Sequence, residues 1–574
     1  MVYLKNYQSL RLRLILLLVF FIIAFGVLLI RVFRLAIIEH RIFVEAAEKQ
    51  HIFSKTLLPE RGRIFFQDKF GELHPAALNR TTISLVVSPR DVEEEEGVVP
   101  LISERLNIKP VVLEEKLSQK DDAYEILAKD ISDEDAKFIE TSDLAGFSLL
   151  RESRRLYPNN DLGANIIGFV GYDAGKETGI YGIERRFQKE LSGEEGFFEG
   201  ERGGSGYWVA IGRRILNPPV NGSSVVLTID RNIQFFLEET LSKILAKWGA
   251  ESAYGLVLDP STGKVLAIAS RPTFNPNEFS KVKDYGVFRL PLVDSQFELG
   301  SVFKPITMAA ALEEGLINPS LTYNDTGVAV FGKSVIKNFD GKAYKTQTMT
   351  QVLEKSLNTG AVWVGQLLGQ KRFREYVELF GFGSNSGIDF PNEVSGNIGN
   401  LESGRDLEFA TASFGQGVAV TPIQMTSAFG VIANGGALLK PYLVEKIIDD
   451  SGNETIFLPE KRRDVISTST SEALTKMLVS AVRSGFENKA GVKGYFVAGK
   501  TGTAQIPMKD RRGYSEDVIH TFVGYAPAFN PKFLVLLQLN KPGGNRFAAN
   551  TITPAFHDLA EFILNYYEIP PDEK

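Results

Sequence analysis

Three short groups in the C-terminal half of the chain carry the residue types of an acyl-transfer site. They are Ser301-Val302-Phe303-Lys304, Ser356-Leu357-Asn358 and Lys500-Thr501-Gly502. Together they supply a hydroxyl nucleophile, two amines and an amide, so a serine can be acylated without the help of histidine. The 574 residues include no cysteine, which excludes thiolate and disulfide chemistry, and the five histidines show no metal-binding spacing. We therefore expect no metal site.

Ser301 and Lys304 lie three residues apart, a spacing that also occurs by chance. The same pattern is found at Ser261/Lys264, Ser280/Lys283 and Ser334/Lys337. Only Ser301 opens a strong helical pattern, over residues 301–314, in which an amine at position i+3 reaches the hydroxyl at position i. A helix N-terminus also favours negative charge developing on that oxygen. Taken alone, however, the spacing favours a serine that merely caps the helix.

The other two groups change this balance. Lys500-Thr501-Gly502-Thr503 follows an apolar run and is the only Lys-Thr-Gly in the chain. Gly502 lets another backbone approach closely, so we expect a peptide substrate to add along this strand. A Ser-x-Asn group is weak by itself, because Ser-Gly-Asn also occurs at residues 395 and 451. The ordered set of three groups is much more specific.

The elements expected around these groups form one large domain, residues 225–574. Apolar runs predict strands over residues 254–258, 265–269, 495–498 continuing into 501–505, 519–525 and 533–539. Helical spacing predicts helices over residues 301–314, 350–368, 422–433, 471–484 and 553–566. Long helices among strands that can pair antiparallel indicate an α+β fold, with the sheet sandwiched between helices.

The N-terminal part of the chain begins with an apolar segment. Residues 14–30 contain no charge, and residues 32–38 extend them, so residues 14–38 are predicted to span a membrane. A cleaved signal peptide is the alternative, but the apolar run is long and no small-residue cleavage site follows it. We expect residues 1–13 inside and residues 39–574 outside the cytoplasmic membrane. Residues 39–224 are predicted to form a pedestal with a helical stalk over residues 39–60.

Two further features limit the function. The glycine-rich residues 195–222 predict a linker or an extended hairpin. The formal net charge of -6 provides no electrostatic basis for binding nucleic acid.

In their order and spacing, the three groups resemble the SxxK, SxN and KTG signature of penicillin-binding proteins and serine β-lactamases. Their middle motif is usually Ser-Asp-Asn, and Leu357 at its centre suits the high-molecular-weight transpeptidases. The apolar N-terminus and three other segments are similar to class B, monofunctional penicillin-binding proteins along nearly the whole chain. These segments are Arg61-Gly62-Arg63-Ile64, Tyr181-Gly182-Ile183-Glu184 and Ser413-Phe414-Gly415-Gln416-Gly417.

The resemblance implies a peptidoglycan D,D-transpeptidase that β-lactams inhibit covalently. It also implies that the enzyme needs no metal and no organic cofactor. Ser301 would attack a stem peptide ending in D-Ala-D-Ala, and Lys304 would take its proton, with a pKa lowered by desolvation and by Lys500. Ser356 would relay a proton to the leaving D-alanine, and Asn358 would orient Lys304 and the substrate. Lys500 and Thr501 would bind the terminal carboxylate, and the backbone N–H groups of Ser301 and Thr503 would form the oxyanion hole. Gly502 belongs to the same substrate-binding strand.

Other functions stay open at this point. A β-lactamase or D,D-carboxypeptidase would need rapid deacylation by water, and no deacylating glutamate is recognisable. A non-catalytic sensor or scaffold could retain an acylatable serine. The resemblance also implies a polytopic glycosyltransferase partner of the shape, elongation, division and sporulation family, with other division or elongation membrane proteins. Residues 334–337 and 492–495 look more like a division-type than an elongation-type member.

Overall fold

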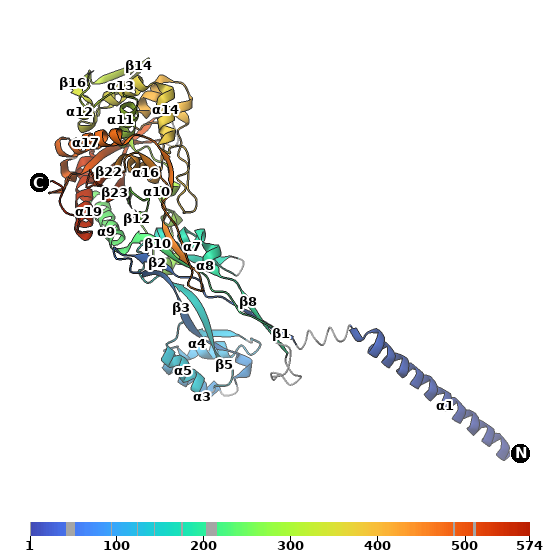
Figure 1. The fold of residues 1–574 in the computed structure, drawn as a ribbon. Coiled ribbons are helices and arrows are strands. Elements are labelled where there is room, and N and C mark those ends of the chain that lie inside the picture. The colour runs from blue at the N-terminus through green and yellow to red at the C-terminus, as the bar shows by residue number, and fades with distance from the viewer. Residues whose placement is uncertain are drawn as a thin grey trace. The chain divides into compact units, whose positions relative to one another are not determined.

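A computed structural model of the chain describes residues 2–41, 52–92, 95–122, 124–142, 144–173, 176–201, 215–485, 488–508 and 513–573 (Figure 1). The residues group into two units. One is formed by Met1–Pro59 with Gly193–Asn221, and the other by Glu60–Ser192 with Gly222–Lys574. All three groups of candidate site residues lie in the second unit.

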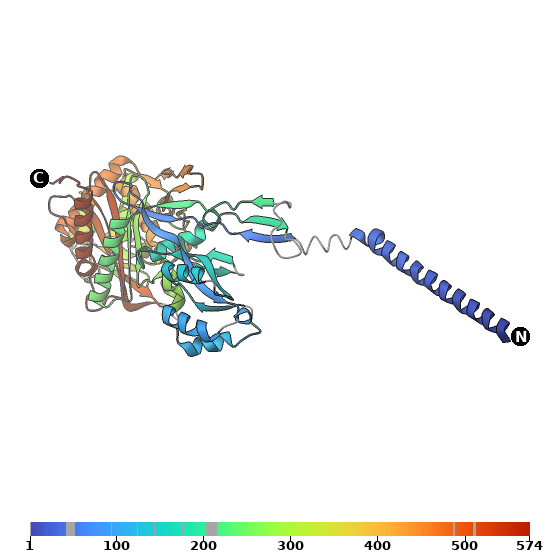
Figure 2. The ribbon, with the colours of Figure 1, turned by 90° about the horizontal axis from the view of Figure 1, so that it is seen from below.

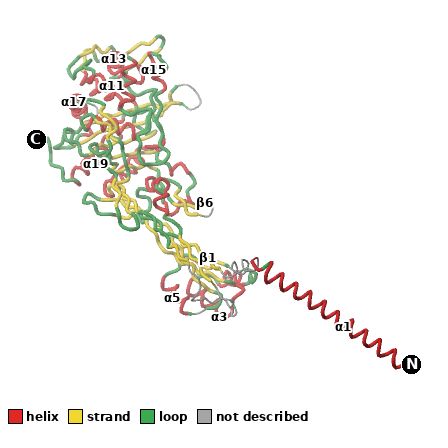
Figure 3. Tube along the Cα trace, turned by 45° about the vertical axis from the view of Figure 1, so that its right-hand side comes forward, coloured by secondary structure: helices red, strands yellow, loops and turns green. Residues whose placement is uncertain are grey.

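The first unit contains a long apolar helix. Helix α1 spans Val2–Phe33 and continues as a π-helical turn at Arg34–Ile38 (Figure 3). Over Leu10–Ile38 it is the one helix among the described residues that is long and apolar enough to cross a membrane. At ~1.5 Å per residue, these 29 residues exceed the ~30 Å hydrocarbon core of a bilayer. The predicted span, residues 14–38, lies within this segment.

The first unit also contains a three-stranded antiparallel sheet. Its order is β1(Ile52–Leu57), β8(Gly196–Glu201) and β9(Ile215–Asn217), and β1 and β8 are neighbouring arrows in Figure 2. The pairing of β8 with β9 confirms the hairpin predicted within residues 195–222, of which residues 202–214 lie outside the described part. The helical stalk is wrong at its C-terminal end, because residues 52–57 form a strand that pairs with β8. Residues 42–51 of that stalk are not among the described residues.

The second unit begins with a seven-stranded mixed sheet. Its order is β19-β18-β10-β2-β3-β4, with β5 also paired to β3, and only the β10–β2 pair is parallel among these strands. The two stretches of this unit, Glu60–Ser192 and Gly222–Lys574, therefore both contribute strands to one sheet. The strands are β2(Ile64–Gln67), β3(His74–Val87), β4(Glu125–Ala128), β5(Phe147–Leu156), β10(Ser224–Asp230), β18(Val444–Ile448) and β19(Glu454–Ile456). Around β3–β5, a small apolar core includes residues of helices α3(Glu95–Leu106), α4(Pro110–Leu117) and α5(Asp133–Thr141).

A buried ionic network holds three distant segments of this unit together. Glu184 is fully buried, and its carboxylate accepts hydrogen bonds from Arg61 Nε at 2.8 Å and from Arg155 Nε at 2.7 Å. Arg61 also donates to Gln188 Oε1 at 2.8 Å. Although burial opposes ionisation, the Arg155 and Arg61 guanidiniums hold the pKa of Glu184 below its usual value. The network therefore joins the chain entering β2, the end of β5 and α7(Gly182–Arg186).

A five-stranded antiparallel sheet forms the centre of the C-terminal domain. Its order is β12(Val265–Arg271), β11(Ser252–Leu258), β23(Phe533–Asn540), β22(Tyr514–Ala526) and β21(Ala498–Pro507). Helices α9(Arg231–Trp248) and α19(Thr553–Tyr566) pack with one face of the strands (Figure 1). The core on the other face includes α11(Lys304–Glu313), α16(Pro422–Ala433) and α17(Thr468–Ser484). The predicted α+β sandwich is confirmed.

Two predicted elements are wrong. The helix expected over residues 350–368 is divided into α12(Met349–Glu354) and α13(Asn358–Leu368), and Ser356 between them has a left-handed φ of 54°. Residues 495–497 are not a strand, because they turn against the C-terminal tail. There Tyr495 donates its hydroxyl proton to the Ile569 carbonyl at 2.5 Å, and the Phe496 N–H donates to Asp572. Sequence periodicity carries no information about either tertiary constraint.

The remaining elements are short and fill the connections between these layers. They are α6(Ala164–Ile167), β6(Val170–Asp173), β7(Lys176–Gly179), α8(Gln188–Ser192), α10(Pro291–Asp294), β13(Thr322–Asp325), β14(Val328–Phe331), β15(Ser334–Lys337), β16(Lys345–Thr348), α14(Gln370–Leu379), α15(Asp406–Ala412), β17(Ala437–Leu439), β20(Lys461–Asp464) and α18(Ala548–Thr551). Of these, β15 and α18 contribute to the candidate site.

Candidate active site

Ser301 lies on a single 3-10 turn, Gly300–Phe303, that leads directly into α11. Gly300 has a φ of +60°, which glycine adopts without strain, and a Cβ there would lie 3.0 Å from the Thr503 carbonyl oxygen. The Gly300 N–H donates to the Gly415 carbonyl at 3.2 Å. The turn is therefore held between strand β21 and the loop that contains Gly415, and Ser301 remains partly exposed.

Lys304 brings the first two motifs together. Its side chain is fully buried, and Nζ donates to the Ser356 carbonyl at 2.5 Å and to Ser356 Oγ at 3.2 Å. Ser356 occupies the break between α12 and α13 in a left-handed conformation, which is uncommon for a residue other than glycine. Strained backbone of this kind is frequent at functional sites because the surrounding contacts impose it. Lys304, which belongs to the first motif, is thus bonded directly to Ser356 of the second motif.

Asn358 has a different contact from the one expected. It is the first residue of α13, and its Nδ2 donates to the Lys337 carbonyl at 2.9 Å. This bond fixes the end of β15 beside the SxN motif. The residues following β15 therefore form one wall of the site.

The third motif lies on β21, the edge strand of the five-stranded sheet. Lys500 is fully buried, and its Nζ donates to the Thr501 carbonyl at 3.2 Å. The backbone that closely approaches Gly502 belongs to the protein itself, since a Cβ there would lie 2.4 Å from the Leu299 carbonyl oxygen. The expectation that this glycine makes room for a substrate strand is thus corrected. Gly502 allows β21 to lie against the nucleophile turn.

Gly502→Ala should slow acylation of Ser301 by about 10²-fold, because a shift of ~1 Å in a catalytic group has an effect of this size. The added methyl would collide with the Leu299 carbonyl and push β21 away from the turn. The measurement is the second-order rate constant for labelling by a fluorescent penicillin. Gly97→Ala is the control, because nothing lies within 4 Å of its Cβ position. An unchanged rate in Gly502→Ala would contradict the proposed packing.

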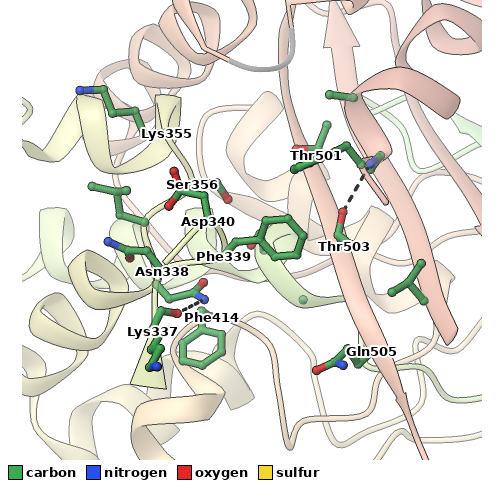
Figure 4. Close-up of a pocket in the computed structure, with 18 of the residues that line it drawn as sticks. Lys337, Asn338, Phe339, Asp340, Lys355, Ser356, Phe414, Thr501, Thr503 and Gln505 are labelled. Atoms are coloured by element: carbon green, nitrogen blue, oxygen red, sulfur yellow. Dashed lines mark hydrogen bonds between the residues drawn. The ribbon is translucent and has the colours of Figure 1, made fainter. Parts of the chain in front are cut away.

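Most of the predicted site residues line a single pocket of about 670 Å³ (Figure 4). In Figure 4, Ser356 lies on one side of the pocket, and Thr501 and Thr503 on β21 lie on the other. Ser301 and Asn358 also line the pocket. Lys304, Lys500 and Gly502 lie behind this surface. The sequence does not mark several further lining residues as part of the site: Lys337, Asn338, Phe339, Asp340, Tyr344, Lys355, Gln505 and Phe547.

Some of these residues left a signal in the sequence and others did not. Phe414 and Gln416 also line the pocket and belong to a segment noted for its family likeness. Lys337 was part of a discounted Ser-x-x-Lys match. Phe339 and Phe547 carry no chemical group and no periodicity that marks them, so only the fold reveals them.

A buried histidine lies beside Thr503 on the neighbouring strand. His520 of β22 is the register partner of Thr503, is fully buried, and has Nδ1 2.8 Å from Thr551 Oγ1 of α18. The Ala548 N–H at the start of the same helix donates to Thr503 Oγ1 at 3.4 Å. Helix α18 is therefore tied to both strands. Burial lowers the pKa of His520 to about 4.

Folding stability should fall as the pH is lowered from 6.5 to about 4, the window between the unfolded and folded pKa values of His520. In this window the unfolded chain binds a proton that the folded chain excludes, so acid favours unfolding by about 3 kcal/mol. Denaturant unfolding at pH 7 and pH 4 measures the change. The parent should lose about 3 kcal/mol more than His520→Asn, and equal losses in the two proteins would contradict the assignment.

Known proteins share both parts of this architecture. The family model for the penicillin binding protein transpeptidase domain matches residues 253–561, and that for the penicillin-binding protein dimerisation domain matches residues 56–227. Stage V sporulation protein D of Bacillus subtilis (strain 168) is 32% identical over 520 residues, which cover 89% of this chain and 79% of that protein. Peptidoglycan D,D-transpeptidase FtsI of Escherichia coli (strain K12) is 28% identical over 560 residues, which cover 96% of this chain and 91% of that protein.

Solved structures show the same fold. Penicillin binding protein 3 from Mycobacterium tuberculosis, complexed with aztreonam, has a TM-score of 0.70 at 25% identity, covering 90% of this chain and 98% of that one. Penicillin Binding Protein 2X from Streptococcus thermophilus has a TM-score of 0.77 at 22% identity, and the match covers 90% of this chain and 81% of that one.

The chain belongs to the penicillin-binding protein transpeptidases, whose domain model covers more than half of it. The dimerisation domain that precedes the transpeptidase domain makes it a class B penicillin-binding protein. It is a serine-type peptidoglycan D,D-transpeptidase.

Proposed function

We propose that Ser301 is the nucleophile of this transpeptidase and that Lys304 is the base that removes its proton. One observation carries the assignment: the buried Lys304 amine donates to Ser356, while Ser301 and Ser356 line the same pocket. Loss of water around a buried amine favours its neutral form, which a base requires. Ser356 is then placed to pass a proton between Lys304 and a leaving group.

The donor substrate is a stem peptide that ends in D-Ala-D-Ala and lies extended along the edge of β21. Its terminal carboxylate binds the Thr501 hydroxyl, with the Lys500 amine behind it on the same strand. The backbone N–H groups of Ser301 and Thr503 form the oxyanion hole, a contribution of about 10²–10³-fold per donor. Gly502 keeps β21 close enough to the nucleophile turn for both N–H groups to reach one oxygen.

The reaction has two acyl transfers. Ser301 Oγ attacks the carbonyl carbon of the penultimate D-alanine, Lys304 takes the hydroxyl proton, and the C–N bond breaks. Ser356 passes a proton to the departing D-alanine amine, leaving an ester on Ser301. The amine of a second stem peptide attacks this ester and frees Ser301. A β-lactam acylates the same Ser301 oxygen as its ring C–N bond opens, but the leaving nitrogen stays attached to the acyl group and blocks the acceptor.

Asn358 holds the opposite wall of the cleft. Its bond to the Lys337 carbonyl fixes the end of β15, and with it the segment that follows, beside the SxN motif. Through its position two residues after Ser356, it also orients Lys304 and the substrate amide.

The expected membrane arrangement completes the proposal. Residues 14–38 span the cytoplasmic membrane, residues 1–13 lie inside it, the pedestal covers residues 39–224, and residues 225–574 act outside. The partner is a polytopic glycosyltransferase of the shape, elongation, division and sporulation family, together with other membrane proteins of the same assembly. The glycosyltransferase supplies the un-cross-linked glycan strands. The relatives named FtsI favour a role in cell division, and a fluorescent fusion that labels the sidewall rather than the septum would reject that role.

The activity test uses the purified full chain in detergent with un-cross-linked glycan strands that carry pentapeptide stems. Mass spectrometry should find cross-linked dimers and one released D-alanine for each cross-link, with neither product in Ser301→Ala. Release of D-alanine without cross-links would indicate a carboxypeptidase, and continuous hydrolysis of benzylpenicillin a β-lactamase. Growth supported by Ser301→Ala would indicate a scaffold.

A further inference from the structure

Two exposed phenylalanines meet at the mouth of the active-site pocket. Phe339 is 57% exposed, Phe547 is 50% exposed, and both line the pocket. Their ring centroids are 5.3 Å apart and the rings are inclined at 72°, an edge-to-face contact. In Figure 4 the Phe339 ring points from the Asp340 side towards the strand that carries Thr501 and Thr503. The contact therefore joins the two walls of the cleft.

The backbone beside Phe339 is firmly anchored on one wall. Asn358 holds the Lys337 carbonyl at 2.9 Å, as described above. Asn338 is buried and donates Nδ2 to both carboxylate oxygens of Asp325, at 2.9 and 3.1 Å. Hydrogen bonds thus fix the two residues that precede Phe339. The exposed Phe339 ring is therefore held over the cleft by an anchored backbone and not by a flexible loop.

Phe547 is anchored in a similar way on the other wall. Its own N–H donates to Asn545 Oδ1 at 2.9 Å, and the next N–H, of Ala548, donates to Thr503 Oγ1 at 3.4 Å. Each ring is thus linked to one signature motif through a residue one or two positions away. Lys337 links Phe339 to the SxN asparagine, and Ala548 links Phe547 to the second threonine of KTGT.

We propose that Phe339 and Phe547 form an aromatic gate that determines access of the acyl donor to Ser301. The inference rests on the proposed function, because the gate lies across the cleft between Ser356 and β21. Only the contact between the rings has to break for the gate to open, since the anchored backbones stay in place. An edge-to-face pair of this kind favours the closed state by about 2- to 10-fold. A slender peptide with small side chains passes with the least displacement of the rings.

The test measures the second-order rate constant for acylation of the full chain by benzylpenicillin, in detergent and far below saturation. Phe339→Ala and Phe547→Ala should each accelerate acylation by about 2- to 10-fold. The double variant should be no faster than the faster single variant, because loss of either ring already opens the gate. Slower acylation in the single variants would show instead that the rings bind the ligand. The gate would also be overturned if the two substitutions accelerated acylation multiplicatively in the double variant, or if neither changed the rate constant.

Two controls keep the outcome clear. Phe235→Ala on α9 removes a ring with the same exposed fraction, 57%, outside the pocket lining, and should leave the rate unchanged. Phe339→Trp keeps a large ring at this position and should be acylated at the slow rate of the parent. This variant tests the gate if Phe339→Ala proves unstable. A parent protein that benzylpenicillin does not acylate at Ser301 would reject the proposed function, whereas an acylated parent with unchanged variants would reject only the gate.

Discussion

Lys304→Met should lower the rate of Ser301 acylation by about 10³-fold, a typical effect of losing a positioned general base. Methionine retains most of the volume of the buried side chain but removes the amine that donates to Ser356 at 2.5 and 3.2 Å. The measurement is the rate constant for covalent labelling by a fluorescent penicillin, followed by rapid mixing and gel fluorescence.

Lys476→Met is the matched control, since that lysine is exposed on α17 and its loss should leave the rate unchanged. A thermal unfolding curve of Lys304→Met that overlays the parent's would show that the folded state is kept. Labelling at the parental rate by a folded Lys304→Met protein would remove Lys304 from the role of base.

Glu184→Gln should destabilise the second unit by about 3–5 kcal/mol, because it leaves two buried guanidiniums without a counter-charge. Arg61 and Arg155 have side chains only 6% and 4% exposed, and both are paired with the Glu184 carboxylate. Glutamine keeps the shape and one acceptor oxygen but lacks the charge. Denaturant unfolding of the full chain in detergent measures the change in free energy.

The comparison is a surface ion pair with a similar N–O distance. Glu140 accepts from Arg151 at 2.8 Å, with both side chains about half exposed, and Glu140→Gln should cost less than about 1 kcal/mol. Equal effects of the two substitutions would show that the network around Glu184 is not what holds its three segments together.

The sequence predicts the chemical groups of this site better than their arrangement. Ser301 and Lys304 are neighbours by helical spacing alone, and an apolar run predicts the strand that carries Thr501 and Thr503. The edge position of that strand is known only from the strand order of the folded sheet. The bond from Lys304 to Ser356 is not predictable in this way, because 52 residues separate the partners. The uninterrupted periodicity of residues 350–368 even conceals the break at Ser356, which long-range contacts impose.

Local patterns also fail where the partner of a residue is distant. Gly502 was correctly expected to allow a close backbone approach, but the approaching segment is the chain's own Leu299. Phe339 and Phe547 are 208 positions apart and become neighbours only through the fold. Helices 422–433 and 553–566 were predicted with the observed bounds, because a proline in the first turn marks each start.

The most direct measurement treats the full chain with benzylpenicillin and maps the resulting mass increase by peptide mass spectrometry. A single adduct on the peptide that contains Ser301, absent from Ser301→Ala, is the predicted result. An adduct on Ser356 or any other side chain, or one that persists when the Ser301 hydroxyl is gone, would contradict it.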